Sequence, residues 1–495
     1  MAINSRLLLA LAGSFVFVAL YNAMVLIDIP FFFLSYLTLM VFWVLGCYLY
    51  LGNLLSRSFY VFGLSLCLPM ISHPLDYLPE VISSGLDQIV LSRGSKDGIL
   101  LGDRIQIRSY LVSLTGYLLL AEVLCFLTKK NALLFLKTLA FCIAILIVVF
   151  MHSYDGYSLI QVFLDLGKFA GGAAICGFLR AEKFDDKFKG RSWALMSTVL
   201  GCLSVVVVFD ILVTLTGLIG WSESYRGGLQ GVFYAFEGPY SWVVGTVFVF
   251  TLATKRYFSL PFFIILILGL TVLAMTNIKT AAGALFITAV FLPILRSKLM
   301  FRSSVPLFII GVALVSSVGI NQESLASVAS RVGTYIAYAS LFPYDFNWLI
   351  GYKPGVIEFV SRSNLAHHFI SLDFSFLLSA FASNLTDEVV ARGTASDFSD
   401  AFLPHSAALA LLASYGIVLL PPAFFYCVGA PAHFLWRINE IQGSDLILLS
   451  ILVYWVIFSH LHPMIFVIPI VLITELIRKN INFREMSGET SERQY

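Results

Sequence analysis

The sequence predicts an all-α polytopic membrane protein with about fourteen transmembrane helices. Composition is the first reason, because 59% of the 495 residues are hydrophobic and only 12% are charged, whereas soluble domains contain about 25% charged residues. The second reason is a succession of apolar segments long enough to span a bilayer. The third is a long polar stretch, 321–403, which predicts a large, partly helical loop at one membrane face.

Each predicted helix rests on an apolar run, and a spanning helix needs about 20 such residues. The runs cover residues 7–27, 31–51, 57–72, 109–128, 132–152, 157–179, 192–219, 240–254, 257–275, 279–295, 304–320, 403–427, 444–460 and 463–477. The first lacks a small-residue cleavage site, so we expect a retained helix. The chain then divides into N-terminal helices that form a scaffold or lipid path, helices with basic residues at their outer ends, the loop, and C-terminal helices (1–190, 191–320, 321–403 and 404–495).

The distribution of Lys and Arg predicts that both termini are cytoplasmic, because short loops rich in these residues stay inside. Alternate predicted loops contain most of the basic residues, whereas the intervening short loops contain few. Several basic residues after position 200 do not follow this rule and fall on the predicted outer side, namely Arg226, Lys279, Arg331, Lys353, Arg362 and Arg392. The net charge of +2 is too small to predict a nucleic-acid partner.

The outer basic residues predict a binding site for a diphosphate. Arg226, Lys279 and Arg331 each fall within a few residues of an outer helix end, so three helices could direct cations toward one point. Guanidinium groups bind phosphate oxygens through two parallel hydrogen bonds, and Lys adds a compact charge. Lys353 is a further candidate ligand. The alternative for each residue taken alone is solvation or pairing with an acidic neighbour.

His405 is the candidate general base. It follows Pro404 at the start of a predicted helix, and Asp397 and Asp400 upstream could fix its tautomer. A neutral imidazole can take a proton from an attacking sugar hydroxyl. The alternative is an interfacial or capping histidine, and the rival bases are His367, His368, His460 and His462. The sequence has no nucleotide-binding loop and no metal-ligand spacing, so we expect neither a cofactor nor a metal.

The segment that begins at His405 resembles a family signature. In HSAALALLASYGIVLL, His405 and Ser406 are followed after nine residues by Gly416. This string is similar to the histidine, small polar residue and glycine signature of the O-antigen ligase and Wzy-type polymerase superfamily. The second glycine of the signature is replaced here by Leu419.

Three upstream segments resemble the same superfamily in the same order. Arg226 through Tyr240 is similar to its R-x-x-G…P-N segment, with Tyr240 where Asn is common. Lys279 stands where the family has an arginine at its next outward helix end. Arg331, followed by the glycine-rich turn 351–355, resembles the start of its large periplasmic loop. The resemblance covers about residues 221–427, a little under half of the chain.

The resemblance implies a GT-C-like glycosyltransferase that acts on undecaprenyl-diphosphate-linked glycans at the periplasmic face of a bacterial inner membrane. Arg226, Lys279, Arg331 and Lys353 would bind the diphosphate, Arg331 and His405 would be catalytic, and Asp397, Asp400 and Tyr240 would support them. Transfer would invert the anomeric centre without a metal. The implied partners are the lipid-linked donor and acceptor, membrane lipid, a chain-length regulator and a flippase.

Several functions remain open at this point. We favour a polymerase that joins lipid-linked repeat units over a ligase that transfers the glycan to lipid A core, because the ligase-type second glycine is absent. Transfer of the glycan to protein is a third product. A flippase for lipid-linked oligosaccharide is a different class, and charged residues inside predicted spans would suit it, namely Glu122, Lys137, Asp165, Lys168 and Asp210. Its expected internal repeat is not seen.

Overall fold

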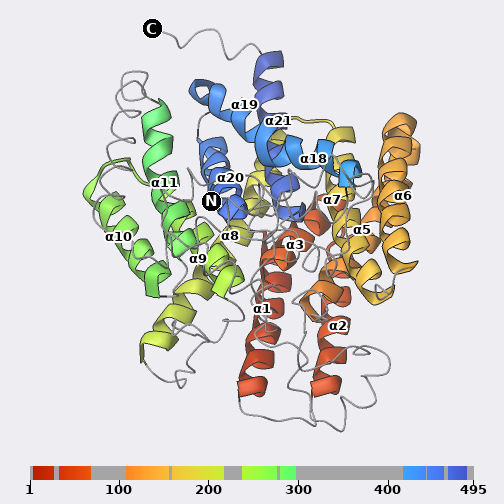
Figure 1. Cartoon of the computed structure of the whole chain (residues 1–495), viewed down its shortest axis with the longest axis horizontal. Coiled ribbons are helices and arrows are strands. Elements are labelled where there is room, and N and C mark those ends of the chain that lie inside the picture. The colour runs from red at the N-terminus through yellow and green to blue at the C-terminus, as the bar shows by residue number, and fades with distance from the viewer. Residues whose placement is uncertain are drawn as a thin grey trace, which may run out of the picture.

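The computed structural model describes residues 4–26, 33–67, 107–154, 159–216, 237–275, 279–296, 416–441, 443–461 and 467–487. Within these residues the regular elements are all helical, so the predicted all-α class is confirmed for them. The longer helices are α1 (Ser5–Leu26), α2 (Phe33–Tyr50), α3 (Leu54–Cys67), α5 (Ile107–Lys130), α6 (Ala132–Tyr154), α7 (Leu159–Ala181), α8 (Asp186–Thr216), α9 (Glu237–Ala253), α10 (Leu260–Met275), α11 (Lys279–Arg296), α20 (Ser444–Leu461) and α21 (Val467–Ser487). They pack side by side as a bundle (Figure 1).

Asparagine and aspartate side chains mark the starts of several helices. The Oδ1 atoms of Asn4, Asn53, Asn131 and Asp185 each accept a hydrogen bond from the backbone N–H three residues later, at 2.7 to 3.0 Å. The first N–H groups of a helix have no partner within the helix, so a side-chain acceptor stabilises that end. These caps explain why α1, α3, α6 and α8 begin where they do.

Short connections fix the directions of α9, α10 and α11. Six residues, 254–259, join α9 to α10, and three residues, 276–278, separate α10 from α11. Each helix of this group packs against the other two. Since α10 is antiparallel to both of its neighbours, α9 and α11 run in the same direction and begin at the same end of the bundle.

Helix α21 runs parallel to α7. A Cβ added at Gly171, in the middle of α7, would lie 2.9 Å from Ile468 Cδ1 at the start of α21. Further along both helices, Arg180 in the last turn of α7 binds Glu475 in the middle of α21, so the two helices run in the same direction. Basic residues collect where α7 and α21 end, and we call this the basic end: Lys129, Lys130, Arg180, Lys183, Lys187, Lys189, Arg191, Arg437, Arg478, Lys479 and Arg484. The opposite end is where α7 and α21 begin.

Small residues allow α5 and α7 to approach closely. A Cβ on Gly167 of α7 would lie 2.3 Å from the Cβ of Ser113 and 2.6 Å from its Cα, and a Cβ on Gly116 would lie 2.3 Å from the Gly167 carbonyl oxygen. Such small-residue contacts are typical of helices that associate within lipid, where backbone approach replaces the hydrophobic effect as the source of attraction.

The Gly167→Ala substitution is therefore expected to destabilise the fold by about 2 kcal/mol, because the added methyl group meets backbone that cannot give way without separating the helices. Gly201 in α8 is the matched control, since a Cβ there would have no neighbour within 4 Å. Gly201→Ala is expected to stabilise the protein by up to about 1 kcal/mol through helix propensity. Thermal unfolding of both variants in detergent checks this, and equal effects of the two substitutions would contradict the packing argument.

The segment after Gly416 differs from the predicted single helix 403–427. Its described part consists of a 3₁₀ turn (Gly416–Val418), α18 (Leu420–Phe424), a π-helical turn (Phe425–Gly429) and α19 (Ala430–Trp436). Prolines stand in the first turn of both α18 and α19, and proline interrupts the backbone hydrogen bonds of a continuous helix. In Figure 1 the pieces cross the bundle near the basic end, between the labels α18 and α19.

Large apolar side chains remain exposed on several helices. Two described stretches, Leu111–Lys130 in α5 and Asp186–Val213 in α8, are long and apolar enough to cross a membrane, and eight more apolar stretches have 10 to 17 residues. Figure 1 shows α10 and α6 on opposite flanks. Their exposed residues include Leu133, Leu136, Ile143, Leu146, Ile147 and Phe150 on α6, and Leu260, Phe263, Ile264, Ile267 and Leu268 on α10.

Candidate functional site

The structure describes the backbone of two predicted site residues. Tyr240 is in the first turn of α9, and Lys279 is the first residue of α11. Both helices begin at the same end of the bundle. The other predicted site residues lie outside the described ranges, namely Arg226, Arg331, Lys353, Asp397, Asp400 and His405.

Aromatic contacts with α20 hold the start of α9 in place. The hydroxyl of Tyr454 donates to the Ser241 carbonyl oxygen at 3.1 Å, and Trp455 Nε1 donates to Thr246 Oγ1 at 2.8 Å. The rings of Trp242 and Trp455 lie 5.1 Å apart, and all of these side chains are buried. Such hydrogen-bonded aromatic packing restricts the position of a helix end. Tyr240 therefore directly precedes an anchored turn.

Gly245 shows how closely α9 and α20 approach. A Cβ at this position would lie 1.9 Å from the Tyr454 hydroxyl oxygen. Only glycine leaves room for the phenol ring, and the ring is what reaches the Ser241 carbonyl group. The glycine and the tyrosine therefore act together to place the beginning of α9 against α20.

The glycine of the family-like signature adopts a left-handed backbone conformation. Gly416 has φ of +60° and is buried at the start of the 3₁₀ turn. Other residues rarely adopt this conformation because of their Cβ atom. A turn that requires glycine therefore follows the predicted base His405 by eleven residues.

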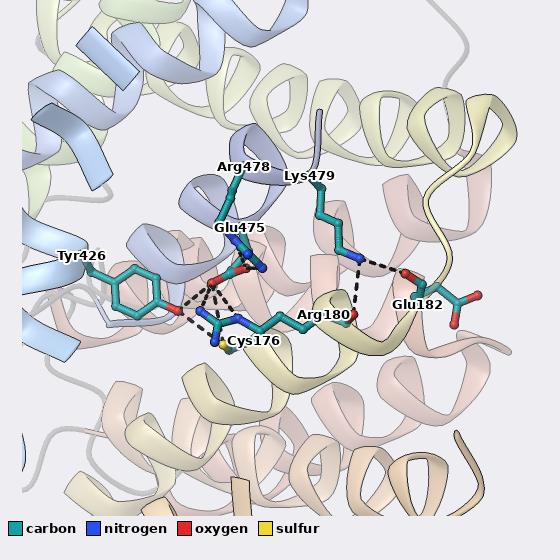
Figure 2. Close-up of polar contacts among 7 residues, drawn as sticks. All are labelled: Cys176, Arg180, Glu182, Tyr426, Glu475, Arg478 and Lys479. Carbon is teal, nitrogen blue, oxygen red and sulfur yellow. Dashed lines mark hydrogen bonds and ion pairs between the residues drawn. The ribbon is translucent and has the colours of Figure 1, made fainter. Parts of the chain in front are cut away.

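A second polar site lies at the basic end, around a buried carboxylate. Glu475 on α21 has no solvent exposure. Its Oε1 accepts hydrogen bonds from Arg180 Nη2 at 2.7 Å and from the Tyr426 hydroxyl at 2.9 Å. Its Oε2 accepts from Arg478 Nη2 at 2.6 Å and Nε at 2.9 Å. Figure 2 shows the two guanidinium groups and the phenol converging on this carboxylate.

Two further side chains extend this cluster. Cys176 Sγ lies 3.3 Å from the Tyr426 oxygen and 3.7 Å from Glu475 Oε1. Lys479 Nζ donates to the carbonyl oxygens of Arg180 and Glu182, where α7 ends. Burial lowers the pKa of Lys479, and the adjacent Arg478 lowers it further. The cluster thus ties α7, α21 and the π-helical turn together, and its carboxylate is too fully hydrogen-bonded to act as a base.

The sequence did not point to Glu475. The residue lies inside a predicted span, and its partner Arg180 comes 295 positions earlier, so spacing could not reveal the pair. The available signal was a lone carboxylate in an apolar run, three residues before Arg478. A charge of this kind requires a partner when it is buried.

Glu122, which the sequence placed inside a span, also has a partner. Its Oε1 lies 2.6 Å from Arg57 Nη1, and Arg57 Nε donates to the Tyr48 carbonyl oxygen. The pair joins α5 to the start of α3. The ion pair with Arg57 is sufficient to explain a charged residue at position 122, without a role in transport.

Within the described residues, no group of three or more His, Cys, Asp and Glu side chains could hold a metal ion. No protein-family model, curated protein or solved structure matches this chain.

Proposed function

We propose that this protein is a polymerase that joins undecaprenyl-diphosphate-linked oligosaccharide repeat units into a surface polysaccharide, such as O-antigen. The observation that carries the proposal is the order of four family-like segments between residues 225 and 416. Two of these segments include the starts of α9 and α11, which belong to one end of the bundle. The positive φ of Gly416 explains in physical terms why the fourth segment has a glycine at this position.

The proposed setting is a bacterial inner membrane, crossed about fourteen times with both termini in the cytoplasm. The exposed apolar faces of α6 and α10 support this setting, because soluble proteins rarely expose apolar patches of more than a few hundred Å². The collection of Lys and Arg at the basic end supports the orientation, since basic residues favour the cytoplasmic side. The predicted glycan site would then face the periplasm.

The proposed reaction is a direct displacement with inversion. A hydroxyl oxygen of the acceptor sugar attacks the anomeric carbon of the donor, the bond from that carbon to the diphosphate breaks, and His405 takes the hydroxyl proton. Arg226, Lys279, Arg331 and Lys353 would stabilise the charge that develops on the departing lipid diphosphate. Asp397, Asp400 and Tyr240 would support the base and the helix ends. Positioning two large substrates supplies much of the remaining rate acceleration.

The test is turnover by the purified protein in nanodiscs, supplied with its lipid-linked repeat unit alone. The proposal predicts a ladder of longer lipid-linked glycans. Transfer that occurs only after lipid A core is added would instead identify a ligase. Movement of the donor across liposomes without any transfer would identify a flippase and refute the enzyme proposal.

A further inference from the structure

The basic end contains an excess of positive charge around the Glu475 cluster. Arg180, Arg478 and Lys479 lie together there, whereas the acidic groups facing them are Glu475 and Glu182. One positive charge is therefore left over within a partly buried cluster. Burial lowers the pKa of Lys479, and so do Arg478 and Arg180, whereas Glu475 and Glu182 raise it. Such an excess favours an anion at this place.

The Glu475 carboxylate also holds the two guanidinium groups in fixed positions. Arg180 and Arg478 each use Nε and Nη2 to bind Glu475. Among the residues that the structure describes, the Nη1 nitrogen of each has no hydrogen-bond partner. The side chains of Arg180 and Arg478 are 38% and 31% exposed. Two partly exposed guanidinium groups are thus held on one carboxylate, each with a nitrogen that the carboxylate does not use, and guanidinium donors suit phosphate oxygens.

The surroundings of the cluster fit a lipid headgroup better than a free ion. Helix α6 packs against α7, which carries Arg180, and α6 begins at the basic end. There Leu133 and Leu136 are 62% and 58% exposed. An acyl chain could lie along these leucines while its phosphate meets the guanidinium groups.

An exposed tryptophan also lies toward the basic end. Trp436 is 88% exposed at the end of α19. The next residue, Arg437, pairs with Glu485 on α21, ten residues beyond Glu475. Tryptophan is enriched where membrane proteins meet the headgroup region. This side chain therefore places a residue typical of the headgroup region at the basic end, toward which the cluster also lies.

We propose that Arg180 and Arg478, held by Glu475, bind the phosphate of an anionic phospholipid at the end of the bundle opposite the predicted glycan site. Phosphatidylglycerol is the headgroup class, because it combines a phosphodiester with a net negative charge. The site rests on the membrane setting proposed above and not on glycosyl transfer. Lipid binding is measured without a glycan substrate, so failure of one proposal is distinguishable from failure of the other.

The test compares thermal unfolding of the full-length protein in detergent after addition of phosphatidylglycerol, zwitterionic phosphatidylcholine or inorganic phosphate. The wild type is expected to gain several degrees more from phosphatidylglycerol than from either other addition. Arg180→Gln is expected to lose most of that difference. Arg437→Gln is the matched control: Arg437 lies at the same end but is already paired with Glu440 and Glu485, so this variant should keep the difference.

Three outcomes would overturn the proposal: equal stabilisation by both lipids in the wild type, an undiminished preference in Arg180→Gln, or equal protection by inorganic phosphate. If Arg180→Gln does not purify as a folded protein, Arg180→Lys replaces it, since an ammonium group preserves the ion pair with Glu475. This variant loses the second nitrogen that would reach the phosphate. It is expected to show a reduced preference for phosphatidylglycerol, and an unchanged preference would refute the site.

Discussion

The His405→Ala protein is expected to bind its lipid-linked repeat unit and to polymerise it at least 10²-fold more slowly than the wild type, because removal of a general base typically costs about 10² to 10⁴ in rate. Without the imidazole, the acceptor hydroxyl would have to lose its proton to water. The initial rate of ladder formation on gels measures the effect, with donor binding measured separately.

His433→Ala is the control for this substitution. His433 is an exposed histidine on α19, so its removal is expected to leave the polymerisation rate unchanged. A His405→Ala rate within a factor of a few of the wild type would exclude His405 as the base. The rival histidines at 367, 368, 460 and 462 would then be tested in the same assay.

Glu475→Gln is expected to destabilise the protein by about 3 kcal/mol, because removing one member of a buried ion pair leaves uncompensated charge. The substitution keeps the size of the side chain but places Arg180 and Arg478 together without a carboxylate. Their partial exposure reduces the cost from that of a fully buried pair. Thermal unfolding in detergent measures it as a lower midpoint.

Glu440→Gln provides the comparison, because Arg437 retains its second partner Glu485. Exposed ion pairs contribute about 1 kcal/mol or less, so we expect a change in this range. Equal losses of stability in the two variants would show that the burial of Glu475 is not what makes its cluster stabilising.

The positions of many helices could be predicted from apolar runs alone. The runs 132–152 and 279–295 correspond to α6 and α11, and 444–460 corresponds to α20. The reason is physical: a helix that satisfies its own backbone hydrogen bonds is the favoured form of a long apolar segment. Whether each of these helices crosses a membrane stays a prediction.

The run 463–477 did not predict the end of α21, which continues to Ser487. The additional turns are polar, and tertiary contacts hold them. Asn480 and Arg484 both bind Asp445 at the start of α20. An apolar run marks only the apolar part of a helix, so polar continuations that depend on distant partners cannot be recognised from it.

The candidate glycan site was predicted from local motifs. Of the helix ends that would carry it, the structure describes the starts of α9 and α11. The anchoring of α9 through Tyr454 and Ser241 joins residues more than 200 positions apart. Contacts of this range leave no pattern in a single sequence. The motif order could suggest which residues belong to the site, but not which side chains hold the helix ends that carry them.

Binding of a polyprenyl diphosphate to the purified protein tests most directly the claim that cations at the start of α11 hold a lipid-linked diphosphate. The wild type is expected to bind the diphosphate more tightly than the matching monophosphate. Lys279→Ala is expected to weaken diphosphate binding about tenfold, the loss of roughly one charge-assisted hydrogen bond. Lys129→Ala, at an exposed position at the end of α5 and outside the Glu475 cluster, should leave it unchanged. Equal affinity for the two lipids, or equal effects of the two lysine substitutions, would contradict the account.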